Sequence, residues 1–129
     1  MAKLTDYIVT DEVVAIRYLA KIKYAKEKGI EFSLTLGDYK RLQNTKRCFY
    51  SKIPLYRGRV YGDLSFNSFT LDRIDNKQGY IKGNVVACAF GINQVKATME
   101  SDYKEFNIKA LEYVVSQMKM VKALKKLKI

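Results

Sequence analysis

Apolar positions in the first third of the chain recur at helical spacing. Over residues 11–28 they fall on one side of a helix, with lysines and an arginine in the gaps and Gly29 as the expected C-cap. Further on, Thr35 and Asp38 have the spacing of a capping box and predict a second, short helix to about Gln43. The N-terminal part is therefore predicted to be helical and basic.

The pattern changes in the middle of the chain. Residues 48–67 contain the only proline and several tyrosines, which predicts irregular loops with short strands. Residues 68–74 alternate as a strand, residues 75–79 are rich in turn formers, and residues 81–87 predict a second strand. We expect a β-hairpin with a long loop, followed by a helix over about residues 87–96.

The last part of the chain predicts a long amphipathic helix that starts from Ser101 as N-cap and ends in lysines. Its apolar face consists of Phe106, Leu111, Val114, Met118, Val121 and Leu124. Together these elements predict an α+β fold. A length of 129 residues predicts a single domain over residues 1–129.

The charge balance points to a polyanionic partner. Lys and Arg total 24 against 13 for Asp and Glu, a formal net charge of +11. Nucleic acid, with double-stranded DNA first, is the expected partner. No apolar stretch approaches the ~18 residues of a membrane span and the N-terminus has no apolar signal core, so we expect an intracellular protein without a membrane partner.

Histidine is absent from the sequence and cysteine occurs twice. Without histidine, Ser-His and Cys-His catalysis and His-ligated zinc are excluded. Chemistry must then use carboxylates, amides, Tyr, Lys or a metal held by oxygen ligands. On a hairpin followed by a helix, Asp72 and Asn93 can converge on one hydrated Mg²⁺ or Mn²⁺, and Asn84 can bridge the hairpin loop with its amide.

The same segment carries a family resemblance. In order it holds Leu71-Asp72-Arg73-Ile74-Asp75-Asn76, Gly79-Tyr80, Gly83-Asn84-Val85-Val86 and Asn93 with Lys96. This series resembles the HNH endonuclease family, in its small phage-type branch, and the similarity extends from about Arg17 to Lys96. The resemblance implies a ββα-metal core over about residues 48–98, flanked by helices over about residues 11–29 and 101–127, and it implies the cytoplasm of a host cell for a phage-encoded protein.

Two departures from the family bear on catalysis. Arg73 stands where the family usually has the histidine that activates water, and Ala89 stands where it often has another. Arginine stays protonated, so Arg73 can bind phosphate or stabilise charge but cannot easily remove a proton. Water activation would fall to the metal, to Asp75 or to the substrate phosphate, which makes Arg73 and Asp75 the candidate catalytic residues.

A third departure concerns zinc. The family often holds a structural zinc with two Cys-x-x-Cys knuckles, and here Cys48 and Cys88 are each the first cysteine of a knuckle whose second is missing. Two thiolates make a poor tetrahedral site, so we expect no structural zinc. The two cysteines are predicted to be packed neighbours, with Phe49, Tyr50 and Phe90 in place of the metal.

Basic residues supply the candidate nucleic-acid contacts, which are Arg17, Lys21, Lys28, Arg57, Arg59 and Lys96. Tyrosines between them, Tyr50, Tyr56 and Tyr61, either stack on nucleic acid or pack a loop-rich shell.

Three functions remain open. The first is a Mg²⁺-dependent DNA endonuclease or nicking enzyme, which the intact metal-facing pattern favours. The second is a catalytically silent HNH-like DNA-binding protein. The third is a phage protein that inhibits a host nucleic-acid-handling or defence protein by binding it.

Overall fold

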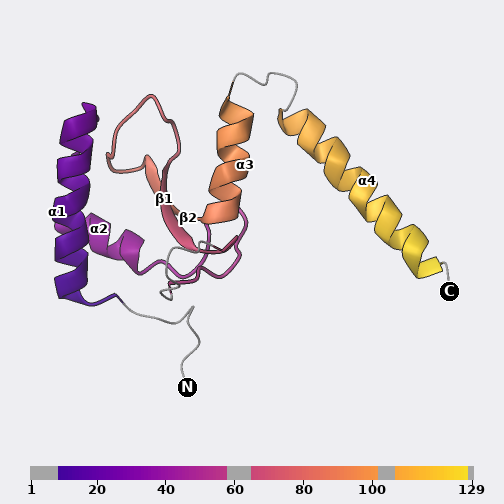
Figure 1. Ribbon diagram of the computed structural model, residues 1–129, viewed down its shortest axis with the longest axis horizontal. Helices are drawn as coiled ribbons and strands as arrows, with labels where there is room; N and C mark the ends of the chain where they lie inside the picture. The colour runs from indigo at the N-terminus through magenta and orange to yellow at the C-terminus, as the bar shows by residue number, and fades with distance from the viewer. Residues whose placement is uncertain (1–8, 58–64, 102–106, 128–129) are drawn as a thin grey trace. The chain divides into compact units, whose positions relative to one another are not determined.

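The computed structural model describes residues 9–57, 65–101 and 107–127 (Figure 1). In chain order the elements are helices α1 (Asp11–Lys28) and α2 (Leu36–Gln43), strands β1 (Phe69–Arg73) and β2 (Val85–Ala89), and helices α3 (Phe90–Glu100) and α4 (Ile108–Leu127). The predicted α+β class, with an antiparallel hairpin followed directly by a helix, is confirmed. The chain divides into two compact units, Met1–Asn93 and Gln94–Ile129, so α3 begins in one and ends in the other.

Helix α1 begins and ends at the residues that the sequence predicts. The Thr10 hydroxyl accepts the Val13 N–H at 3.4 Å and caps the first turn. Gly29 adopts the left-handed conformation with φ of 67°, and its N–H donates to the carbonyls of Ala25 and Lys26. Glycine tolerates this conformation at no steric cost, which explains why the helix ends there.

Helix α2 is fixed by the predicted capping box. The Asp38 N–H donates to the Thr35 hydroxyl at 3.1 Å, and the Thr35 N–H donates to the Asp38 carboxylate at 3.0 Å. The helix ends at Gln43, whose side-chain oxygen accepts a hydrogen bond from Arg17 of α1 at 2.8 Å. The two N-terminal helices are thereby packed together.

The hairpin differs from the sequence prediction in its second strand. Strand β1 lies within one residue of the predicted bounds, and it pairs with β2 so that Asp72 faces Val86. The prediction that a strand covers residues 81–87 is wrong, because Asn84 N–H donates to the Ile81 carbonyl at 3.0 Å and closes a turn. Strand β2 therefore begins at Val85, and α3 begins at Phe90 rather than near residue 87.

Three clusters of buried apolar side chains form the core of the first unit. One consists of Cys48, Leu55, Ala87, Cys88 and Ala89. The second consists of Ala25, Leu34, Tyr80 and Val85, and the third of Val9, Val14 and Tyr39. Leu71 and Phe32 pack against both the second and the third cluster, so β1 is joined to the helical part of the unit through them.

The loop-rich middle is confirmed for its described parts, residues 48–57 and 65–67. There the chain makes isolated bridges between Arg47 and Pro54 and between Tyr56 and Ser68 instead of longer strands. Tyr61 and Arg59 lie outside the described residues.

The second unit holds the long C-terminal helix. Ser101 is not its N-cap: the Ser101 hydroxyl donates to the Thr98 carbonyl at 2.6 Å and belongs to the end of α3. Helix α4 begins at Ile108, where the Asn107 side chain accepts the Ala110 N–H at 3.0 Å, and Phe106 lies outside the described residues. In the part of the chain that the structure describes, no helix combines the length and apolarity needed to cross a membrane.

Candidate functional site

Asp72 lies on β1 with its side chain buried at 8% exposure. Its Oδ2 accepts a hydrogen bond of 2.7 Å from the Tyr50 hydroxyl. A phenol that donates a hydrogen bond to a carboxylate fixes the orientation of that carboxylate. Tyr50 therefore positions the carboxylate, a contact that joins residues 22 positions apart and that no local pattern predicts.

Asn93, in the first turn of α3, reaches the same strand. Its Nδ2 donates to the Thr70 hydroxyl at 3.3 Å, and that hydroxyl donates to the Cys88 carbonyl at 2.8 Å. Thr70 and Asp72 are two residues apart on β1, so their side chains project from one face of the hairpin about 7 Å apart along the strand. The amide of Asn93 and the carboxylate of Asp72 thus both belong to this face.

Carboxylate and amide oxygens are ligand types that Mg²⁺ accepts, and a hydrated Mg²⁺ commonly takes one or two carboxylates from the protein and completes its shell with water and phosphate oxygens. Within residues 9–57, 65–101 and 107–127, no group of three or more His, Cys, Asp or Glu side chains is placed to hold a metal ion. A site at Asp72 and Asn93 would therefore need its remaining ligands from water and substrate.

The Asn84 side chain bridges the hairpin loop. Its Oδ1 accepts the Asp75 N–H at 2.9 Å, and its Nδ2 donates to the carbonyls of Asp75 at 3.1 Å and Gly79 at 2.8 Å. The Asp75 carboxylate accepts hydrogen bonds from the Lys77 N–H at 3.0 Å and the Gln78 amide at 3.2 Å. Asp75, a candidate base from the sequence, thus shapes the loop.

Arg73 also holds the loop. Its Nη1 donates to the carbonyls of Asn76 at 3.1 Å and Gln78 at 3.0 Å, and its guanidinium carbon lies 5.4 Å from the centre of the Tyr80 ring. Lys21 of α1 approaches the same ring, with Nζ 5.1 Å from its centre. Burial, and to a smaller extent the charge of Arg73, lowers the pKa of Lys21. Two cations therefore share one buried aromatic ring.

Cys48 and Cys88 are neighbours, with their sulfur atoms 3.9 Å apart and both side chains fully buried. The predicted aromatic cover is wrong for Phe49 and Tyr50, which are 50% and 39% exposed because Tyr50 turns toward Asp72. Leu55 fills that space instead.

The Cys48 thiol has an unusual environment. Burial raises its pKa, but hydrogen bonds from the Ser51 side chain and from the backbone of Ala89, Ser51 and Tyr50 outweigh burial and lower the pKa to about 7. Ser51 stands where a knuckle would carry its second cysteine, and here it stabilises the thiolate of the first.

The predicted nucleic-acid contacts have different surroundings. Arg57 is turned inward: its Nε donates to the Gln43 carbonyl at 2.9 Å, another nitrogen donates to the Thr45 carbonyl, and the guanidinium lies 4.3 Å from the centre of the Phe69 ring. Burial, then the charge of Arg17, lowers its pKa to about 10. Arg57 is thus a structural residue that ties the end of α2 to β1.

The other predicted nucleic-acid contacts differ in their exposure. Lys28 is exposed, whereas Arg17 is bonded to Gln43 and half-buried. Lys96 forms an ion pair with Glu100 one turn further along α3. Arg59 lies outside the described residues.

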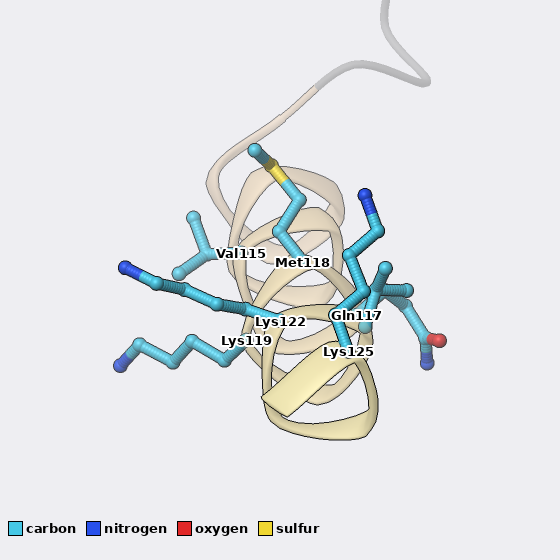
Figure 2. Close-up of a pocket in the computed structure, with 7 residues that line it drawn as sticks. Val115, Gln117, Met118, Lys119, Lys122 and Lys125 are labelled. Carbon is cyan, nitrogen blue, oxygen red and sulfur yellow. The ribbon is translucent and has the colours of Figure 1, made fainter. Parts of the chain in front are cut away.

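Helix α4 has a hollow on its surface. Figure 2 shows Lys119, Lys122 and Lys125 around Val115 and Met118, and the hollow has a volume of about 620 Å³. The described residues of α4 include none that is buried. Apolar and basic side chains therefore line this hollow together, rather than lying on separate faces of the helix.

Similar proteins occur in viruses. The chain is 37% identical over 79 residues to the uncharacterized 29.0 kDa protein of the dda-modA intergenic region of Enterobacteria phage T4, a match that covers 61% of this chain and 28% of the phage protein. It is 31% identical over 83 residues to an uncharacterized protein of Acanthamoeba polyphaga mimivirus, a match that covers 64% of this chain and 14% of that protein. The matched region is thus less than a third of either relative. No protein-family model and no solved structure matches the chain.

Proposed function

We propose that the chain is a Mg²⁺-dependent DNA endonuclease or nicking enzyme built on an HNH-like ββα core. The observation that carries the proposal is that Asp72 on β1 and Asn93 on α3, which contacts Thr70 of the same strand, each supply an oxygen ligand. The Asp72 carboxylate is oriented by the hydrogen bond that it accepts from the Tyr50 hydroxyl, and the Asn93 amide by the hydrogen bond that its Nδ2 donates to the Thr70 hydroxyl. Preorganised ligands of this kind lose little freedom when they bind an ion.

The roles of the residues follow from these contacts. Asp72 would hold Mg²⁺ with a carboxylate that Tyr50 keeps in place, and Asn93 would hold it with the neutral Oδ1. A bound divalent cation polarises a phosphoryl oxygen and lowers the pKa of water. Arginine does not accept a proton, so Arg73 would contribute positive charge and hold the loop. The proton of the attacking water would pass to a substrate phosphate oxygen or to the Asp75 carboxylate.

The charge of the chain fits DNA as substrate. A net charge of +11 attracts a phosphate backbone, and attraction of this type weakens steeply with salt. The similar proteins are viral. They support a viral context for the proposal.

A second candidate is a catalytically silent DNA-binding protein. It is favoured by the loop contacts of Arg73 and Asp75, because the two residues nominated for catalysis both serve the hairpin loop and the sequence offers no histidine. This function would keep the charge and the hairpin without hydrolysis.

One experiment separates the two candidates. Purified full-length protein is incubated with supercoiled plasmid in Mg²⁺, Mn²⁺ or EDTA, beside Asp72→Asn, Asn93→Ala and the control Glu12→Gln, an exposed acid of α1. The endonuclease requires nicking that EDTA and both site substitutions abolish and that the control retains. Binding of plasmid without nicking in any metal selects the silent binder, and neither binding nor nicking rejects both.

A further inference from the structure

A polar groove lies between the hairpin loop and the chain that follows α1. It has a volume of about 580 Å³ and runs between residues 29–31 and residues 76–79. Arg73 and Lys77 contribute positive charge to its lining, and Glu31 contributes an acid. Arg73, which lines the groove, directly follows Asp72 on β1.

The two walls of the groove are fixed to each other. The Tyr80 N–H donates to the Glu31 carbonyl at 2.8 Å, and the Ser33 N–H donates to the Tyr80 carbonyl at 3.0 Å. A Cβ atom on Gly79 would lie 2.3 Å from the Glu31 oxygen, so only glycine permits this approach of the two backbones. The groove is therefore shaped before any ligand binds.

Its charged side is also fixed. Two loop carbonyls hold the Arg73 guanidinium, which rests on the Tyr80 ring together with Lys21. Lys21 and Arg73 repel each other, and an anion nearby would relieve that repulsion. Lys77 is exposed on the loop and can follow a ligand that enters.

We infer that this groove binds a backbone phosphate of the nucleic acid, next to the phosphate that would lie at Asp72. The inference rests on the proposed function, because it takes DNA as the ligand. Arg73 and Lys77 contact the phosphate directly, Lys21 adds positive charge beside the Tyr80 ring, and Glu31 opposes binding.

The test measures the affinity of the full-length protein for a short DNA duplex in EDTA, over a series of salt concentrations. Each phosphate contact contributes about 0.9 to the slope of log affinity against log salt. We expect Lys77→Gln to reduce the slope by about that amount. Lys46→Gln, an exposed lysine outside the groove, is the matched control and should change the slope less.

Glu31→Gln should raise the affinity for DNA, whereas a folding defect would lower it. Removing the acid from the groove should tighten binding several-fold at low salt, whereas Glu12→Gln on the first turn of α1 should change the affinity less. If the wild-type protein binds DNA with a steep salt slope but Lys77→Gln and Glu31→Gln behave like their controls, the groove is not the phosphate site and the proposed function stands. If the wild-type protein does not bind DNA, both fall.

Discussion

Replacing Asn84 with alanine should open the hairpin loop and destabilise the first unit. The side chain is 6% exposed and makes three hydrogen bonds to the loop backbone, one as acceptor and two as donor. Each such bond contributes about 0.5–1.5 kcal/mol net, and unpaired groups left in a buried loop add to the loss. We expect the free energy of unfolding to fall by about 3 kcal/mol and the Tm by roughly 10 °C.

Urea unfolding followed by circular dichroism measures this change, with Asn76→Ala as the control. Asn76 is an exposed residue of the same loop, and its replacement should change the free energy of unfolding by less than about 0.5 kcal/mol. Asn84→Asp keeps an acceptor for the Asp75 N–H but sets a carboxylate against two carbonyls, so it should be at least as unstable as Asn84→Ala. A loss below about 1 kcal/mol in Asn84→Ala, equal to that of Asn76→Ala, would refute the reasoning.

Two further predictions concern a close contact and a thiol. Gly79→Ala should cost about 2–3 kcal/mol in chemical unfolding, because its Cβ meets backbone. A Cβ on Gly91 would meet the half-exposed Phe66 ring, so the stability lost in Gly91→Ala should be recovered when Phe66→Ala is added. Equal losses in the free energy of unfolding for Gly79→Ala and Gly91→Ala would contradict this reasoning. The pKa of Cys48 is about 7 in the folded chain against an ordinary value of 9.0, so stability should rise between about pH 7 and pH 9 and be lost as pH falls through 7. Unfolding under reductant at several pH values should show this rise in the wild type and not in Cys48→Ala.

The sequence by itself determines the elements whose signals are local. Helix α1 stops at Gly29 because only a residue that tolerates a positive φ continues the chain there. Helix α2 starts directly after Thr35 because the Thr35 hydroxyl and the Asp38 carboxylate each accept the other residue's backbone N–H within one turn. Strand alternation similarly places β1, and turn formers place the loop after it.

The second strand shows where local signals fail. The sequence predicts a strand from residue 81, yet the Asn84 side chain makes its hydrogen bonds to the loop backbone and residues 81–84 form a turn. Periodicity cannot report this competition, because it depends on where the carbonyls of Asp75 and Gly79 lie.

Tertiary structure alone decides how the site is held. Asp72 and Asn93 can be nominated from residue type and spacing, but the Tyr50 hydroxyl that orients Asp72 comes from a loop 22 residues earlier. In the same way, Lys21 and Arg73 meet only because α1 and the hairpin pack around the Tyr80 ring. Such contacts are set by the packing of distant segments around shared buried side chains, whereas sequence patterns record only the conformation of neighbouring residues.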